Sequence, residues 1–193
     1  MKKILFIIAT VLMGSPLFAQ TTYTFDKNQG SLTFSATAFG TSTVDGCFKS
    51  FNASLKANQA DFSDAVIEMT AEVSSIFTDN KKRNNDLRGS TWLDAQQFPL
   101  IKFVSTALTP TNGDNYRLSG NITIHGVKRP IVFDVVFGGI TEDLEAQSRS
   151  VSFTVTGKLL RTDFGVGSGW LSWAASKEIN LKSTVVFLLE GGS

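Results

Sequence analysis

Residues 116–124 read YRLSGNITI, and this stretch decides the fold. Tyr116, Leu118, Gly120, Ile122 and Ile124 alternate without a break with arginine, serine, asparagine and threonine. Successive side chains of a β-strand point to opposite faces, so an alternation of this kind predicts a strand with one buried and one solvated face. Such half-buried strands are typical of antiparallel sheets.

The same pattern recurs along most of the chain. Seven further runs either alternate in this way or are rich in β-branched and aromatic residues, so we predict them as strands. They are 32–38, 48–57, 65–73, 101–108, 131–137, 151–160 and 179–189. Turn-forming residues at 26–30, 111–114 and 138–139 predict loops between some of them. The total is about eight strands, the number at which an up-and-down antiparallel barrel closes and can enclose one ligand. The predicted fold class is therefore all-β.

One region departs from this period. Residues 79–97 are polar, with Arg83, Leu87 and Leu93 spaced loosely as on a helix. Pro99 then favours a return to extended backbone. We predict a short helical cap between two strands of the barrel.

The first nineteen residues have the features of a cleaved signal peptide. Lys2 and Lys3 precede an apolar stretch at 4–13 that is too short to span a bilayer, and Ala19 supplies the small residue at a cleavage site before Gln20. No cysteine follows closely, so lipoprotein processing has no acceptor. We expect a secreted protein with a mature domain at 20–193.

Composition narrows the classes of function. Charged residues make up 18% of the chain and the formal charge is +1, so neither a nucleic acid nor another polyanion is an expected partner. The chain has sixteen Phe and only two Tyr. A Phe ring has no hydroxyl that needs a hydrogen-bond partner when buried, so this bias predicts an interior lined with hydrocarbon.

The inward faces of the predicted strands supply the candidate lining. The residues that we expect to contact an apolar ligand are Phe34, Phe48, Phe51, Phe103, Leu118, Ile122, Phe133, Val135, Phe153, Leu181 and Val185. The alternative is a packed core with no ligand. Small residues on the same faces, such as Ala53, Ala71 and Gly120, favour a ligand because they leave volume for one.

The sequence offers few residues suited to catalysis or to metal binding. His125 is the only histidine, and both a zinc site and a Ser-His-Asp triad need convergent partners that no motif supplies. We predict no catalytic residue, no metal and no cofactor. The enzyme alternative, acting on a bound lipid, would use Asp86 or Asp163 as its acid or base.

Four segments carry a family resemblance. They are 78–88 (TDNKKRNNDLR), 92–103 (WLDAQQFPLIKF), 124–131 (IHGVKRPI) and 161–166 (RTDFGV). In their order and spacing they resemble the YceI-like polyisoprenoid-binding family over essentially the whole mature chain. The resemblance implies a lipocalin-like barrel with a helical cap, found in the bacterial periplasm, that binds a polyprenyl lipid, an isoprenoid quinone or a similar amphiphile along its interior.

The polar end of the pocket differs from the family pattern. Many members have His where this chain has Asp86, so a polar role of that His does not carry over. Arg83, Arg88 and His125 match the family and are the candidates for binding a head group. The alternative is structural: the arginines bind loop carbonyls or a carboxylate such as Asp94, and the imidazole binds backbone groups.

Two alternatives concern membranes. An outer-membrane barrel also alternates over about eight strands, although its last strand usually ends in an aromatic residue and this chain ends in LLEGGS. Trp170 and Trp173 fit either packing on the barrel rim or a transient contact with a membrane surface. The sequence does not indicate an oligomeric state.

Overall fold

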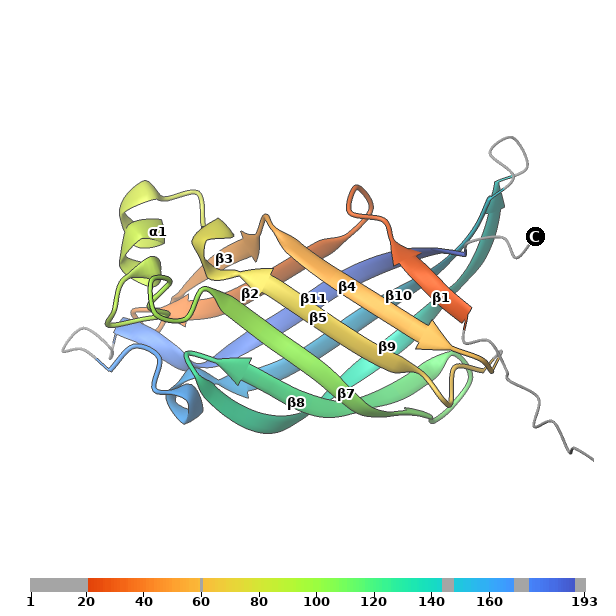
Figure 1. The fold of residues 1–193 in the computed structure, drawn as a ribbon. Helices are drawn as coiled ribbons and strands as arrows, with labels where there is room; N and C mark the ends of the chain where they lie inside the picture. Colours follow the sequence, from red (N-terminus) through yellow and green to blue (C-terminus); the bar gives the residue numbers. More distant parts are fainter. Residues whose placement is uncertain (1–20, 60, 144–147, 169–173, 190–193) are drawn as a thin grey trace, which may run out of the picture.

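Eight strands form a closed antiparallel barrel in the computed structural model, which describes residues 21–59, 61–143, 148–168 and 174–189 (Figure 1). In ring order the strands are β1 (Thr21–Phe25), β4 (Phe51–Ala57), β5 (Val66–Glu72), β7 (Leu100–Pro110), β8 (Asn115–Ile124), β9 (Val127–Asp143), β10 (Ser148–Leu160) and β11 (Ala175–Leu189). The ring closes where β1 pairs with β11. The predicted all-β antiparallel barrel is therefore confirmed.

Three further strands continue the sheet beyond the ring. They are β2 (Ser31–Ala38), β3 (Ser42–Phe48) and β6 (Ile76–Phe77), and they follow β11 in the order β2, β3, β6. β1 pairs with the last residues of β11, and β2 pairs with its earlier part. The predicted strand 32–38 thus lies beside the ring, and β1, a ring member, was not predicted. The predicted strand 48–57 corresponds to β4 alone, and β3 and β6 were not predicted.

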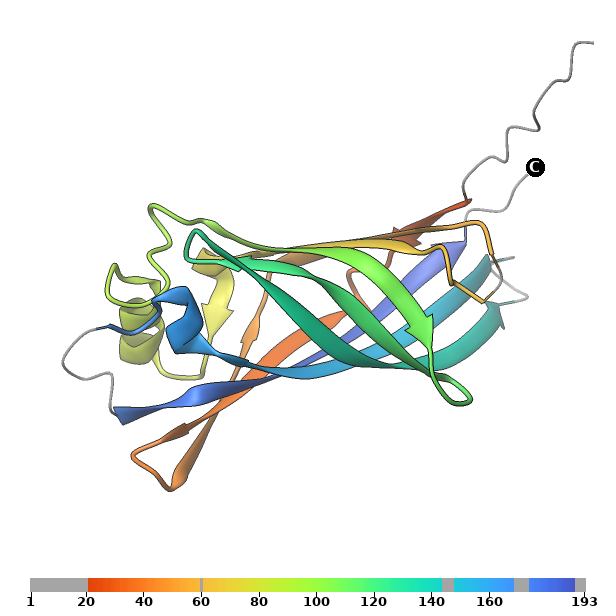
Figure 2. The same cartoon turned by 90° about the horizontal axis from the view of Figure 1, so that it is seen from below.

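A short helix covers one end of the barrel, as predicted. Helix α1 (Lys81–Arg88) begins after Asn80, whose side chain accepts a hydrogen bond from the backbone of Arg83. Residues 89–99 then turn back beneath the helix, and Leu93 is buried there. The described residues also include two 3-10 turns, η1 (Val73–Ser75) and η2 (Arg161–Phe164), and η2 lies at the same end as α1 (Figure 2). No helix in the described ranges combines the length and apolar character needed to cross a bilayer.

The buried side chains follow the alternation in the sequence. In β8, the five residues named above from Tyr116 to Ile124 are buried, whereas Arg117 is exposed. The prediction of a loop at 138–139 was wrong, because Gly138 and Gly139 both lie inside β9. Together they oppose Ser152 of β10, and Gly139 has φ +94°. The glycines therefore form a β-bulge within a long strand.

Candidate ligand-binding site

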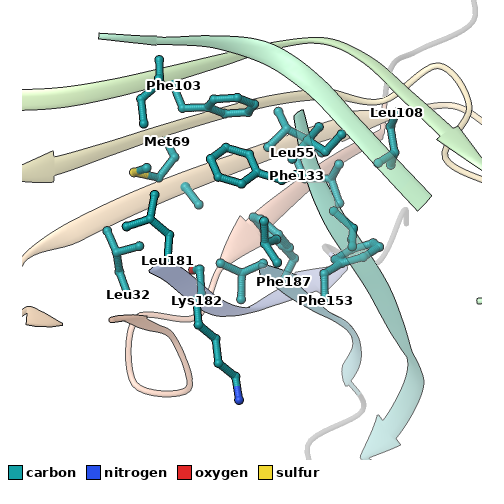
Figure 3. A pocket seen from close by; sticks show the side chains of 18 residues that line it. Leu32, Leu55, Met69, Phe103, Leu108, Phe133, Phe153, Leu181, Lys182 and Phe187 are labelled. Atoms are coloured by element: carbon teal, nitrogen blue, oxygen red, sulfur yellow. The ribbon is translucent and has the colours of Figure 1, made fainter. Parts of the chain in front are cut away.

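A cavity lies inside the barrel, and its walls are almost entirely hydrocarbon (Figure 3). Its lining residues are Leu32, Ala53, Leu55, Ile67, Met69, Phe103, Leu108, Leu118, Ile122, Phe133, Val135, Phe153, Val155, Leu181, Lys182, Ser183, Val185 and Phe187. Figure 3 shows the Lys182 ammonium pointing away from the apolar side chains. A molecule in this cavity is held by the hydrophobic effect and by dispersion contacts, without directional polar bonds.

The cavity is small as it stands, with a volume of about 90 Å³. Pockets that hold drug-sized ligands are usually about 300–1,000 Å³. A long chain can therefore enter only if lining side chains move apart. Met69 and the leucines of the wall have rotatable side chains that can make such room.

Two phenylalanine rings each lie over a glycine on the adjacent strand, and the missing side chain lets the ring lie close to the barrel wall. The Phe103 ring lies where a Cβ on Gly120 would stand, with its Cζ 2.5 Å from that position. The Phe133 ring occupies the corresponding space over Gly157. Both rings line the cavity, and their centroids are 5.5 Å apart. Gly120, one of the small residues that seemed to leave volume for a ligand, therefore makes room for the Phe103 ring instead.

The cavity brings together eight of the eleven residues predicted to line it: Phe103, Leu118, Ile122, Phe133, Val135, Phe153, Leu181 and Val185. The other three lie outside its lining. Phe34 packs on Phe48 with centroids 5.8 Å apart, and Phe51 packs on Phe25 at 5.1 Å. Contact of any of the eleven with a ligand stays a prediction.

Several lining residues were not predicted. The period-two alternation could have identified four of them, because they lie on the same strand faces as small or apolar residues that it had assigned to the interior. These four are Leu32, Leu55, Met69 and Phe187. Leu108 is different. The register of β7 shifts between Ser105 and Ala107, so the inward face moves by one residue and Leu108 is buried.

Arg83 belongs to a polar network at the capped end. Its Nε donates to Thr78 Oγ1 at 2.8 Å, and its Nη2 donates to the Thr78 carbonyl at 2.6 Å. Asn84 is buried, and its Oδ1 accepts from both the backbone nitrogen and the hydroxyl of Thr78, at 2.9 and 2.6 Å. This network ties the start of α1 to the chain that leaves β6.

Arg88 and His125, the other two head-group candidates, also contact backbone carbonyls. Arg88 Nη2 donates to the Ile76 carbonyl at 2.9 Å, and its buried Nε has no hydrogen-bond partner among the described residues. His125 and Gly126, both with positive φ, form the two-residue turn between β8 and β9. His125 Nδ1 lies 3.2 Å from the Phe164 carbonyl, which can only accept, so this nitrogen carries the hydrogen. Binding of a head group by the three candidates stays a prediction.

Arg161 is a buried cation that we did not predict to have a role. Its guanidinium donates to the carbonyls of Val166, Gly167, Ala175 and Ser176 at 2.8–3.0 Å. It also lies 5.2 Å from the Trp92 ring centroid. Burial lowers the pKa of this guanidinium from its ordinary value. Arg161 thereby joins η2, the start of β11 and the segment after α1.

Aromatic rings fill the opposite end of the barrel. Phe62, in the loop between β4 and β5, is 3% exposed, and its ring lies 5.3 Å from that of Phe153 and 5.8 Å from that of Phe137. Its backbone has φ +57°. A left-handed backbone costs a non-glycine residue roughly 1–2 kcal/mol, and burial of a Phe side chain contributes about 1.5–3 kcal/mol. Burial therefore offsets the strain.

The two carboxylates of the enzyme alternative do not line the cavity. Asp86 is exposed on α1, and Asp163 is exposed on η2. Trp170 and Trp173, the signal segment and Gln20 lie outside the described residues. Within the described part of the chain, no three His, Cys, Asp or Glu side chains are grouped so that they could hold a metal ion.

The fold and the cavity define a class: an antiparallel barrel with a hydrocarbon-lined interior, capped at one end by a short helix. Residues 23–187 match the YceI-like domain. The chain belongs to the YceI-like family.

Relatives support this assignment over nearly the full length. A UPF0312 protein of Pseudomonas savastanoi pv. phaseolicola is 28% identical over 178 residues, 91% of this chain and 92% of that one. A UPF0312 protein of Pseudomonas fluorescens is 31% identical over 170 residues, 82% and 85% of the two chains.

Solved structures show the same barrel. Burkholderia cenocepacia BcnA has a TM-score of 0.75 at 25% identity, covering 84% of this chain and 98% of that one. A polyisoprenoid binding domain from Saccharophagus degradans has a TM-score of 0.63, covering 89% and 100%. Its identity is 13%, so this likeness concerns the fold alone.

Proposed function

We propose that the protein is an exported, non-enzymatic carrier that holds the chain of a polyprenyl lipid, an isoprenoid quinone or a similar amphiphile inside the barrel. The observation that carries this proposal is the cavity wall, which offers apolar side chains from strands all around the ring. The Saccharophagus neighbour, described as polyisoprenoid binding, is consistent with it. Apolar burial contributes about 25 cal/mol per Å², so a long chain needs no polar contact to bind.

The polarity of the outer face favours a carrier over an outer-membrane barrel. Arg117 pairs with Asp134 across β8 and β9 at 2.9 Å, and Lys158 pairs with Glu178 across β10 and β11 at 2.9 Å. These side chains are exposed on the outside of the barrel. A membrane barrel instead presents an apolar outer band and a polar interior.

The binding proposal is tested by extracting lipid from the purified protein. We expect organic extraction, after expression in the native host or incubation with isoprenoid lipids, to release a stoichiometric apolar molecule that mass spectrometry identifies. Two neighbouring residues provide a matched pair of variants, because Val135 is 3% exposed and lines the cavity, whereas Val136 is 47% exposed on the outer face. Val135→Phe should reduce the retained lipid several-fold, and Val136→Phe should retain as much as the parent protein. Equal retention by the two variants, or none by the parent, would contradict the proposal.

Export is tested separately. We expect the protein, expressed with its first nineteen residues in a Gram-negative host, to appear in the periplasmic fraction or the medium with an N-terminus at Gln20. Retention of the full-length chain in the cytoplasm would refute export while leaving lipid binding open to the extraction experiment.

A further inference from the structure

Phe153 connects the cavity to the aromatic end of the barrel. It lines the cavity, and on its other side its ring makes an edge-on contact with Phe62, with an interplanar angle of 85°. Phe137 packs on both rings, at 5.8 Å from Phe62 and 5.5 Å from Phe153. Phe62 does not itself line the cavity. It therefore stands behind the cavity wall and supports it.

The loop that carries Phe62 is held in place by hydrogen bonds. Asp64 accepts from the backbone nitrogens of Asn58 and Gln59, and Asp61 accepts from the backbone nitrogen of Ser63. The backbone nitrogen of Phe62 also donates to the Gln59 carbonyl at 3.0 Å. The hydrogen bonds of the loop therefore fix the backbone of Phe62, and the neighbouring aromatic rings fix its side chain.

The two ends of the barrel differ in chemistry. The capped end carries Arg83, Arg88 and His125, whereas rings close the opposite end. An amphiphile that places its polar group at the capped end directs its hydrocarbon tail toward Phe153. The cavity measures about 90 Å³, so a longer chain needs space beyond it, and at the tail end that space lies behind Phe153.

We infer that Phe62 is a positioning residue that sets the greatest length of isoprenoid chain the barrel accepts, by holding Phe153 as the floor of the cavity. This inference rests on the proposed lipid binding. With the Phe62 ring in place, Phe153 cannot move outward, and a chain that is too long must leave apolar units in water. Without that ring, Phe153 can swing into the vacated space. The gain should be about one isoprene unit, because a benzyl group and a five-carbon unit have similar volumes.

The test compares the lengths of chain that variants retain. The purified protein is incubated with an equimolar mixture of all-trans polyprenols from geraniol to solanesol, isolated again, and extracted for mass spectrometry. Phe62→Gly removes the ring and suits the positive φ. Phe39→Gly is its matched control, since Phe39 also has a positive φ of 50° but is 68% exposed. Phe62→Leu is a milder variant that keeps an apolar side chain in case Phe62→Gly does not fold.

We expect the parent and Phe39→Gly to share one upper limit of chain length. Phe62→Gly should move that limit about one unit longer, and Phe62→Leu should move it less, while the shortest retained polyprenols bind as in the parent. Identical length distributions for folded Phe62 variants and the parent would overturn the inference and leave lipid binding intact. A uniform loss of all lengths in both Phe62 variants would also overturn it, because that result indicates general destabilisation. No retention of any polyprenol by the parent would instead refute the proposed function.

Discussion

The ring of Phe133 lies in the space left by the missing side chain of Gly157, and a Cβ placed there would be 2.9 Å from Phe133 Cε1. Gly157→Ala should therefore push this ring into the cavity. We expect several-fold weaker retention of apolar ligand and a loss of about 1–3 kcal/mol of stability, as for other overpacked cores. Displacement of a fluorescent fatty-chain probe measures the first effect, and urea denaturation measures the second.

A glycine away from the cavity is the control for this variant. A Cβ on Gly89, at the end of α1, would lie 3.2 Å from the Asp86 carbonyl and near no cavity residue. Gly89→Ala should retain the probe as the parent does. If Gly157→Ala also bound it normally, the ring would not have been displaced into the binding space.

Arg161 should make a large contribution to stability. Arg161→Met removes the donor that four backbone carbonyls share, and the carbonyls of Val166 and Gly167 belong to buried residues. We expect a loss of about 3–5 kcal/mol in the free energy of unfolding, measured by urea denaturation. Arg117→Met is the comparison, because Arg117 pairs with Asp134 at an exposed site and should cost about 0–1 kcal/mol. Similar losses for the two variants would show that the buried contacts of Arg161 add nothing.

Asn84 should hold the cap in place. Its Oδ1 accepts two hydrogen bonds from Thr78, and both residues are buried. Asn84→Leu should lower stability by about 1–3 kcal/mol and speed amide exchange in α1. Asn85→Leu changes the next residue, which is exposed, and should leave both measurements near those of the parent. Equal amide exchange in the two variants would count against a role of this network in fixing α1.

The loop that carries Phe62 should respond to acid through Asp64. Desolvation raises the pKa of this carboxyl, but hydrogen bonds from Gln59 and Asn58 outweigh it and lower the pKa below its ordinary value of 3.8. A carboxyl whose pKa is lowered by folding stabilises the folded state above its unfolded pKa, and that stabilisation is lost as the pH falls through the folded pKa. The loop should therefore be pH-independent near neutrality and loosen below about pH 4.

Amide NMR signals of Asn58 and Gln59 measure this transition. They should shift with a midpoint below 3.8, and Asp64→Asn should abolish the shift. A midpoint above 3.8 would mean that these hydrogen bonds do not favour the carboxylate.

The longer strands of the ring and much of the cavity wall were predictable because they depend on local alternation. Leu118 and Ile122 in β8 have the burial that their spacing indicates. The inward-facing residues of β7 were only partly predictable, because no sequence pattern near Ser105 indicates the register shift that follows it. There the Ser105 hydroxyl accepts from the Ile67 backbone, an interaction that only the paired strands create.

Residues whose roles depend on distant partners were not predictable in this way. The carbonyl partners of Arg161 come from two chain segments that folding brings together. Phe62 lies in a polar loop, and neither its positive φ nor its inward ring follows from its neighbours in the sequence. The short strand β1 was missed because five residues beside the signal segment carry too few alternating positions.

The pairing of β11 with both β1 and β2 has a consequence for how the chain folds. In the pair that closes the ring, Tyr23 of β1 lies opposite Leu189 of β11, near the other end of the chain. Closure of the ring must therefore wait until the last strand has been synthesised and has met the first. Sheets dominated by such distant pairings fold in milliseconds to seconds, and until closure their apolar faces are open to chaperones and to aggregation. Under the proposed export, this late step delays barrel formation until both ends have arrived in the same compartment.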